Sequence, residues 1–249
     1  MKTANSGPVL ALELEEAGRR LREAESVFVL TGSGISAESG LPTFRGPGGW
    51  WREYRVEELA SPQGFARDPR LVWTWYNERL RMYANARPNA AHYGLAELER
   101  RRPDFTLATQ NVDSLHLRAG SRNVLELHGD LREARCTGCD ERRAIEGEFD
   151  LAAIEHGCGG RFRPNVVWFG EPLPAAVWAR AVAAARRADV LIVVGTSGIV
   201  HPAASLATTY ASKAFVIEIN PEETALTPFV GRSLRGTASS LIPSLLEHM

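Results

Sequence analysis

The chain has few cysteines, little net charge and no long apolar segment. Its 249 residues include three cysteines, too few for a disulfide framework, although two of them have the spacing C-x2-C. With a formal net charge of −1, no overall field attracts the chain to nucleic acid or to a membrane surface. No apolar run reaches the roughly 18 residues of a membrane span, and acidic residues from Glu13 onward interrupt any signal-peptide pattern. We therefore expect a soluble, cytoplasmic protein that binds neither nucleic acid nor membranes; the sequence does not indicate its oligomeric state.

Strand-like apolar runs alternate with helical patterns along most of the chain. The strand-like runs cover 27–32, 104–109, 123–127, 189–194 and 214–219. The main helical patterns cover 10–25, 33–41, 69–86, 88–101, 174–188, 201–214 and about 238–247. This alternation predicts an α/β fold, with a doubly wound parallel sheet of the Rossmann type.

Two stretches interrupt the alternation. Residues 44–87 begin with a segment rich in Gly, Pro and Trp, and residues 133–170 carry all three cysteines. We expect these two insertions to form together a smaller domain. The Rossmann-type domain would then consist of residues 1–43, 88–132 and 171–249.

A glycine-rich turn follows the first predicted strand. Residues 32–37 read G-x-G-x-x-A, a pattern that lets a backbone approach a pyrophosphate at the N-terminus of a helix. A glycine turn in an ordinary α/β protein is the simpler interpretation. The usual dinucleotide pattern also places an acidic residue at the end of the next strand, about 20 residues on. That region here is GPGGWWREY, so a bound NAD must have its ribose held from elsewhere.

Polar clusters follow four of the predicted strands. Alone, each is ordinary turn or capping chemistry, but the carboxyl ends of parallel strands share one edge of a sheet, where ligands bind. The clusters are Gln110-Asn111-Val112-Asp113, His128-Gly129, Gly195-Thr196-Ser197 and Asn220-Pro221.

One predicted helix carries an arginine on its apolar face. In LVWTWYNERL, Arg79 lies one turn after Tyr76 on a face that continues to Met82 and Tyr83. A guanidinium stays charged at ordinary pH, so burying it requires an anion as partner. A salt bridge to an Asp or Glu of the chain is one interpretation, and a ligand carboxylate is the other.

Six segments resemble the sirtuin family, in its order and setting: GSGISAESGLPTFRG, TQNVDSLHLRAG, ELHGDL, RPNVVWFGE, VVGTSGIVHPA and IEINPEET. The resemblance runs from about residue 27 to 243. It implies an NAD-dependent protein lysine deacylase that yields nicotinamide and O-acyl-ADP-ribose, with a large Rossmann-type domain and a small zinc-binding and helical module.

The resemblance also implies roles for individual residues. His128 would be the catalytic base, for which the ordinary pKa of histidine, about 6.5, suits neutral pH. Val167, Trp168, Phe169 and Gly170, within a strand edge at 166–171, would pair with an extended acyl-lysine peptide. The residues that would hold NAD are Gly32, Ser33, Gly34, Ile35, Ser36, Thr43, Phe44, Arg45, Trp51, Gln110, Asn111, Val112, Asp113, Gly195, Thr196, Ser197, Asn220, Pro221, Glu222 and Ala238.

Tyr76 and Arg79 match a Tyr-x-x-Arg motif that the resemblance places in the acyl pocket of members that remove succinyl or malonyl groups. Residues i and i+3 share a helix face, and a guanidinium and a phenol can both donate to one carboxylate. We therefore expect a preference for succinyl- and malonyl-lysine, with weaker deacetylation. The alternatives are a plain deacetylase, and an ADP-ribosyltransferase or NAD-binding protein.

The cysteines depart from the family's four-cysteine zinc pattern. Cys136, Cys139 and Cys158 fit three of the four positions, but the third position is occupied by Glu155, with His156 next to it. The fourth ligand is then His156, Glu155 or water, or the metal site is weak or lost. We favour His156, because zinc accepts histidine readily.

Overall fold

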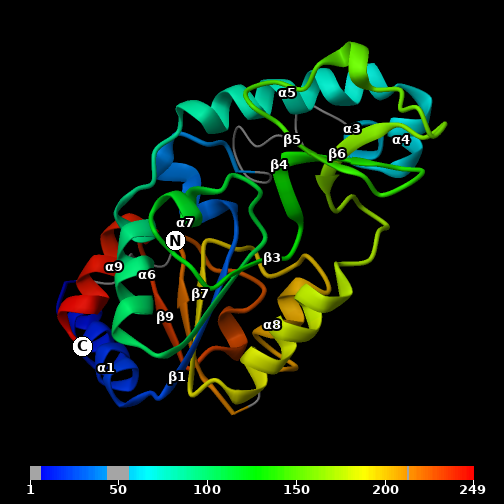
Figure 1. The fold of residues 1–249 in the computed structure, drawn as a ribbon. Helices are drawn as coiled ribbons and strands as arrows, with labels where there is room; N and C mark the ends of the chain where they lie inside the picture. The colour runs from blue at the N-terminus through cyan, green and yellow to red at the C-terminus, as the bar shows by residue number, and fades with distance from the viewer. Residues whose placement is uncertain (1–6, 44–55, 212) are drawn as a thin grey trace.

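A six-stranded parallel sheet forms the centre of the larger part of the molecule (Figure 1). The computed structural model describes residues 7–43, 56–211 and 213–249. The strands lie in the order β3 (Val124–Glu126), β2 (Asp104–Thr109), β1 (Ser26–Thr31), β7 (Val190–Val194), β8 (Phe215–Ile219) and β9 (Arg232–Leu234). From β1 the chain adds β2 and then β3 on one side. It then adds β7, β8 and β9 on the other side of β1. This doubly wound order confirms the predicted fold class.

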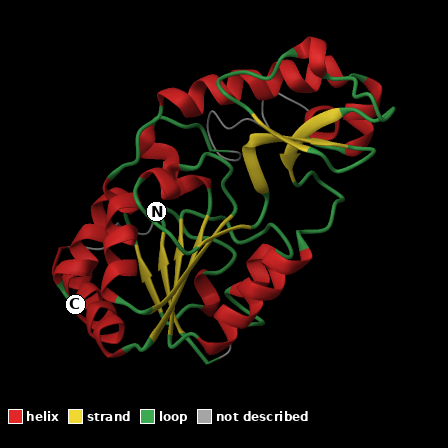
Figure 2. Ribbon diagram, viewed as in Figure 1, coloured by secondary structure: helices red, strands yellow, loops and turns green. Residues whose placement is uncertain are grey.

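Both faces of the large sheet are covered by helices (Figure 2). Successive strand residues point to opposite faces, so Val27 and Val29 belong to one apolar cluster and Phe28 and Leu30 to the other. The first face packs against α1 (Gly7–Glu23), α6 (Ala90–Arg101) and α9 (Ala238–Glu247). The second packs against α8 (Ala175–Arg187) and the 3-10 turn η3 (Ala203–Leu206). Each fully buried Val, Leu or Phe contributes roughly 1.5–3 kcal/mol to this packing.

A smaller unit with its own apolar core lies beyond one end of the large sheet (Figure 2). It contains an antiparallel sheet, β5 (Arg142–Ala144), β4 (Gly129–Cys136) and β6 (Phe162–Val166). Its helices are α3 (Val56–Leu59), α4 (Pro62–Arg67), α5 (Pro69–Asn85) and the 3-10 turn η2 (Leu151–Ala153). The predicted boundary between the two domains, at residue 132, falls within β4, because this strand begins directly after the turn that carries His128.

Trp73 fixes α5 onto the smaller sheet. Its indole stacks on Phe149 with ring centroids 3.8 Å apart, and its Nε1 donates a 2.8 Å hydrogen bond to the carbonyl of Phe162. Asn77, one turn further along α5, both accepts from and donates to the backbone of Phe149, at 2.9 Å in each direction. The capping side chain of Asp68 accepts from the amide of Leu71 and defines where the helix begins.

Some local predictions were wrong. The helix expected over 201–214 is reduced to η3, where the hydroxyl of Ser205 donates to the carbonyl of Pro202 and the β-branched Thr208 and Thr209 follow. The helix expected over 33–41 is the 3-10 helix η1 (Ser33–Ser39). The sequence did not indicate β9. The remaining short elements are α7 (Leu115–Arg118) and η4 (Thr227–Phe229). Within the described residues, no helix is both long and apolar enough to cross a membrane.

Two glycines hold the turn after β1 against the loop after β7. The amide of Gly34 donates to the carbonyl of Gly195 at 2.8 Å. Gly195 has a φ of +60°, and a Cβ there would lie 2.4 Å from the backbone nitrogen of Ile35. The two strand ends can therefore meet only because neither residue has a side chain.

Replacing Gly195 with alanine should separate these strand ends. The left-handed conformation and the backbone clash together should cost about 2 kcal/mol or more in the free energy of unfolding, because the backbone of Ile35 cannot move aside freely. Chemical denaturation of Gly195→Ala measures this loss. Gly7→Ala is the control, because a Cβ at Gly7 meets nothing within 4 Å. Equal stability of the two variants would contradict the prediction.

Candidate functional site

A cleft opens at the carboxyl edge of the large sheet and reaches α5. It holds about 270 Å³ of empty space. Two kinds of side chain meet in it: polar groups from the ends of β1 and β2, and an arginine and a tyrosine from α5. The lining residues are Ser33, Ser36, Leu41, Pro42, Arg79, Tyr83, Asn111, Val112 and Asp113.

Buried polar groups from β1 and β2 are hydrogen-bonded to one another beside the cleft. The hydroxyl of Ser36 donates to Asp113 at 2.7 Å, and the amide of Leu115 donates to the other carboxylate oxygen at 2.9 Å. Asn111 donates through Nδ2 to the carbonyl of Gly32 at 3.1 Å. Burial raises the pKa of Asp113, while these hydrogen bonds and the charge of Arg79 act in the opposite direction. The network fixes a polar wall in one geometry.

Other residues that were predicted to hold NAD lie along the same edge. Gln110 donates through Nε2 to Thr196 Oγ1 at 3.1 Å, and Asn220 donates to the carbonyl of Thr196 at 3.2 Å. The carbonyl of Ser197 accepts from Ala225, and Ala238 is buried as the first residue of α9. Ile35 is buried next to the glycine turn, Pro221 and Glu222 are exposed after Asn220, and Thr43 is half-buried. Phe44, Arg45 and Trp51 lie outside the described residues.

His128 stands in the turn between β3 and β4, where the two sheets are connected. Its Nδ1 lies 2.9 Å from the carbonyl of Gln110. A carbonyl can only accept, so Nδ1 carries the proton and Nε2 is the basic nitrogen. Burial lowers the pKa of His128, and the hydrogen bond to Gln110 partly opposes this. The imidazole is therefore neutral at pH 7, the state that a general base requires.

The segment expected to pair with a peptide lies next to His128. The amide of Val167 donates to the carbonyl of His128 at 2.8 Å. The predicted strand edge over 166–171 is shorter than expected: β6 ends at Val166, and the chain turns at Phe169 and Gly170. Directly after this turn, Glu171 pairs with the buried Arg163, which contacts both of its carboxylate oxygens at 2.5 and 2.9 Å.

Glu171 holds the backbone of Trp168, and Tyr76 holds its indole. The second carboxylate oxygen of Glu171 accepts from the backbone amide of Trp168 at 2.8 Å. The Nε1 of Trp168 donates to the hydroxyl of Tyr76 at 2.9 Å, and both side chains are buried. Tyr76 is thereby part of the packing behind the peptide segment, and it does not line the cleft.

Arg79 lines the cleft from α5 and is only 2% exposed. Its guanidinium carbon lies 4.5 Å from the ring centre of Trp75 and 5.4 Å from that of Tyr83. Its Nη2 donates to the hydroxyl of Tyr83 at 2.5 Å. The sequence placed Tyr83 on the same helix face but assigned it no role.

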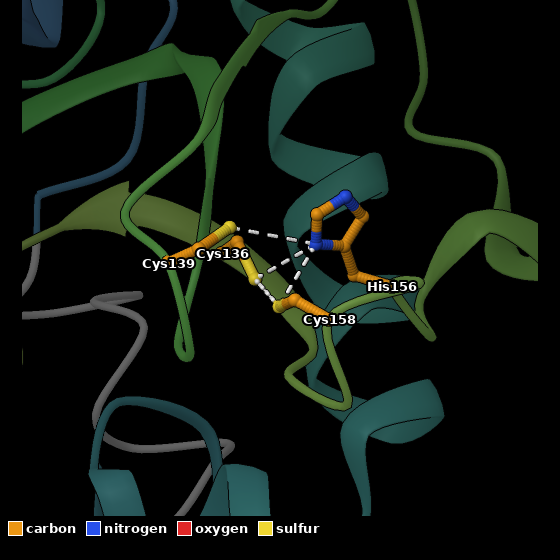
Figure 3. A group of neighbouring side chains, drawn as sticks. All are labelled: Cys136, Cys139, His156 and Cys158. Atoms are coloured by element: carbon orange, nitrogen blue, oxygen red, sulfur yellow. Dashed lines mark hydrogen bonds between the residues drawn. The ribbon is translucent and has the colours of Figure 1, made fainter.

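A second cluster lies in the smaller unit, where Cys136, Cys139, His156 and Cys158 converge (Figure 3). Their four ligand atoms all lie within 4.8 Å of one another. His156 Nδ1 is 3.1–3.6 Å from the three sulfurs, and the sulfurs of Cys136 and Cys158 are 3.5 Å apart. A tetrahedral zinc ion with ordinary bond lengths would separate nitrogen from sulfur by about 3.5 Å and sulfur from sulfur by about 3.8 Å. The donor set and its spacing therefore fit zinc.

The second nitrogen of His156 faces a carboxylate. His156 Nε2 lies 3.1 Å from Glu141 Oε2, and Arg143 donates to the other oxygen of Glu141 at 2.9 Å. Such an outer carboxylate orients a metal-binding imidazole. Glu155, the alternative ligand, is instead paired with Arg161 at 2.9 Å.

Comparisons with known proteins find similarity to one family. A sequence model of the Sir2 family matches residues 32–202. The protein of Archaeoglobus fulgidus named NAD-dependent protein deacylase 1 is 50% identical over 238 residues, which cover 94% of this chain and 97% of that protein. An NAD-dependent protein deacylase of Thermus thermophilus is 50% identical over 241 residues, covering 93% of this chain and 95% of that protein.

Solved structures agree with these relatives. A Sir2 homologue in complex with NAD superposes with a TM-score of 0.87 at 49% identity, covering 94% of this chain and 93% of that one. Sir2Af2 bound to a myristoylated histone peptide superposes with a TM-score of 0.77 at 35% identity, covering 96% of each chain.

The cysteine and histidine cluster should hold one zinc ion per chain. His156→Ala should lower the zinc affinity strongly, and Glu141→Gln should lower it roughly tenfold or more, because the imidazole loses its orienting partner. Elemental analysis and the rate of zinc transfer to a chromogenic chelator measure both effects. Glu155→Ala is the matched control, because Glu155 pairs with Arg161. Zinc retention in His156→Ala equal to that of the unmodified protein would contradict this ligand set.

Proposed function

Because the chain belongs to the Sir2 family, we propose that it is an NAD-dependent protein lysine deacylase with a preference for succinyl- and malonyl-lysine over acetyl-lysine. Its products are free lysine, nicotinamide and O-acyl-ADP-ribose. The one observation that carries the acyl preference is a buried guanidinium, that of Arg79, in the same cleft as the polar residues assigned to NAD.

NAD fits the edge of the large sheet. The glycine contact between the ends of β1 and β7 leaves the backbone of both turns close together, as a pyrophosphate site requires. Ser36, Asn111 and Asp113 present a fixed polar wall to the cleft. When bound, NAD supplies the ribose that accepts the acyl group and releases nicotinamide.

His128 is suited to act as the base. Its Nδ1–H is fixed by Gln110, so Nε2 can take a proton from a ribose hydroxyl. The carbonyl of His128 accepts from the amide of Val167, so the base and the peptide segment are held next to each other. An extended acyl-lysine peptide that lies along 166–170 would therefore present its acyl group beside the base.

Arg79 supplies the acyl preference. A carboxylate at the end of a succinyl or malonyl chain can accept two hydrogen bonds from one guanidinium, whereas an acetyl group offers it no anion. The competing explanation is that Arg79 serves as a counter-charge for Asp113, whose pKa it lowers. Asp113 also accepts from Ser36 and from the amide of Leu115, so its carboxylate does not depend on Arg79 alone.

Two other functions fit parts of the same site. A plain deacetylase would act on acetyl-lysine at least as fast as on succinyl-lysine. An ADP-ribosyltransferase would release nicotinamide without producing deacylated peptide. Simultaneous measurement of nicotinamide and of free lysine with acetyl-, malonyl- and succinyl-lysine peptides of one sequence separates the three possibilities.

The pH profile should reflect the environment of His128. The neutral form is the base, and burial lowers the pKa of this histidine, so activity should persist below the ordinary value of about 6.5 before it declines. The acid limb of kcat/KM for the peptide, measured from pH 5 to 8 at saturating NAD, reports this pKa. An acid limb centred above 6.5 would contradict the assignment.

Arg79→Met should change the acyl preference. Removing a charged hydrogen-bond donor from a buried site should lower the ratio of kcat/KM for succinyl-lysine to that for acetyl-lysine about 30-fold or more. The matched control is Arg81→Met on the same helix, whose side chain is exposed and paired with Glu148. An unchanged ratio would show that the pocket assignment is wrong, and an equal loss on both peptides would favour the counter-charge explanation.

A further inference from the structure

The order of the strands divides the proposed NAD site into two halves. The glycine turn assigned to the pyrophosphate follows β1 at the centre of the sheet, and His128 follows β3 on one side of it. Because the base acts on the ribose that carries nicotinamide, this half of NAD belongs on the side of β2 and β3. The adenosine half then lies over the ends of β7 and β8, where Thr196, Ser197 and Asn220 were predicted to hold NAD.

The loop after β8, residues 220–227, is attached to the loop after β7. Asn220 Nδ2 donates to the carbonyl of Thr196 at 3.2 Å. The amide of Ala225 donates to the carbonyl of Ser197 at 3.3 Å. The geometry of the adenosine half therefore depends on what holds residues 220–227, which we call the β8 loop, in place.

A buried carboxylate holds the β8 loop against the sheet. β8 reads FVIEI, and Glu218, its only charged residue, is 1% exposed. Its Oε1 accepts from the hydroxyl of Thr224, and its Oε2 accepts from Thr227 Oγ1 at 2.8 Å. Ser233 Oγ, on β9, also donates to Oε2 at 2.8 Å. Burying a charge is costly, so a carboxylate within an apolar strand requires such a set of donors.

Arg235 supplies the counter-charge and contacts the β8 loop at two points. Its Nη1 lies 3.2 Å from Glu218 Oε2 and donates to the carbonyl of Glu222 at 2.6 Å. Its Nη2 donates to Thr227 Oγ1 at 3.0 Å. Neither Glu218 nor Arg235 is among the residues that the sequence assigned to NAD. Together they connect the β8 loop to both β8 and the chain after β9.

We propose that Glu218, together with Arg235, positions the β8 loop for the adenosine half of NAD and thereby sets the affinity for NAD. This inference rests on the proposed function. The ion pair acts through the loop, because the reacting atoms lie at His128 in the other half of the site. Loosening the loop should weaken the binding of NAD and of ADP-ribose, which both contain adenosine, and should leave the binding of nicotinamide unchanged.

Glu218→Gln should weaken the adenosine half selectively. The amide keeps the size of the side chain but removes the charge with which Arg235 pairs. The KM for NAD should rise about tenfold or more, and so should the Kd for ADP-ribose, measured by calorimetry on the protein without NAD. The kcat and the inhibition constant for nicotinamide should each stay within about twofold of their original values.

Thr224→Val and Ser233→Ala form a matched pair that leaves the ion pair intact. Each removes one hydroxyl that donates to Glu218, but Thr224 belongs to the β8 loop and Ser233 to β9. Thr224→Val should raise the Kd for ADP-ribose about fivefold or more, and Ser233→Ala should leave it within about twofold. Thermal midpoints check that the variants are compared in the folded state. If Glu218→Gln does not fold, this pair decides.

The outcomes separate this inference from the proposed function. An equal Kd for ADP-ribose in Thr224→Val and Ser233→Ala would overturn the inference, because the carboxylate would then only stabilise the fold. A loss of kcat in Glu218→Gln with an unchanged Kd for ADP-ribose would also overturn it. The proposed function fails in a different way: the unmodified protein would bind ADP-ribose but release no nicotinamide from NAD in the presence of an acyl-lysine peptide.

Discussion

The close backbone contact between Gly34 and Gly195 determines where this molecule can place a ligand. It joins the ends of β1 and β7, the two central strands from which the sheet extends in opposite directions. Because no side chain occupies the junction, the turns after both strands come within hydrogen-bonding distance. The polar residues that follow β2 and β8 are then held beside the same junction, through Gln110 and Asn220 on Thr196. A Rossmann-type sheet places its binding site at this reversal of strand order for the same geometric reason.

The cleft combines two charged groups that burial would otherwise make costly. Asp113 is stabilised by two local donors, Ser36 and the amide of Leu115. Arg79 lies against aromatic faces and donates to the hydroxyl of Tyr83, and both kinds of contact attract a cation. These contacts hold the guanidinium at the cleft that it lines.

Much of the fold could be predicted from the sequence, for identifiable reasons. Strands buried on both faces are continuous apolar runs, so β1, β2, β7 and β8 were evident. β5 reads RRA and β9 has three residues, so neither has a pattern long enough to recognise. The convergence of polar clusters at one sheet edge followed from strand direction alone. The contacts of the two tyrosines could not be predicted in this way. A helical pattern shows that Tyr76 and Tyr83 share a face of α5, but it does not show which residues each side chain contacts. Trp168, 92 residues after Tyr76, donates to the hydroxyl of Tyr76, whereas Arg79 donates to that of Tyr83.

The position of His156 shows how backbone geometry can bring a histidine to a cluster of cysteines. The position of the expected third cysteine is occupied by Glu155, whose backbone forms a β-bridge with Arg161 and whose side chain pairs with the same residue. In an extended segment, successive side chains point in opposite directions. Glu155 is consequently turned away from the cysteines, and the next residue is turned toward them. His156 therefore reaches the three sulfurs from the position next to Glu155, with its Nδ1 3.1–3.6 Å from them. Glu141 then orients the ring so that Nδ1 faces the three sulfurs.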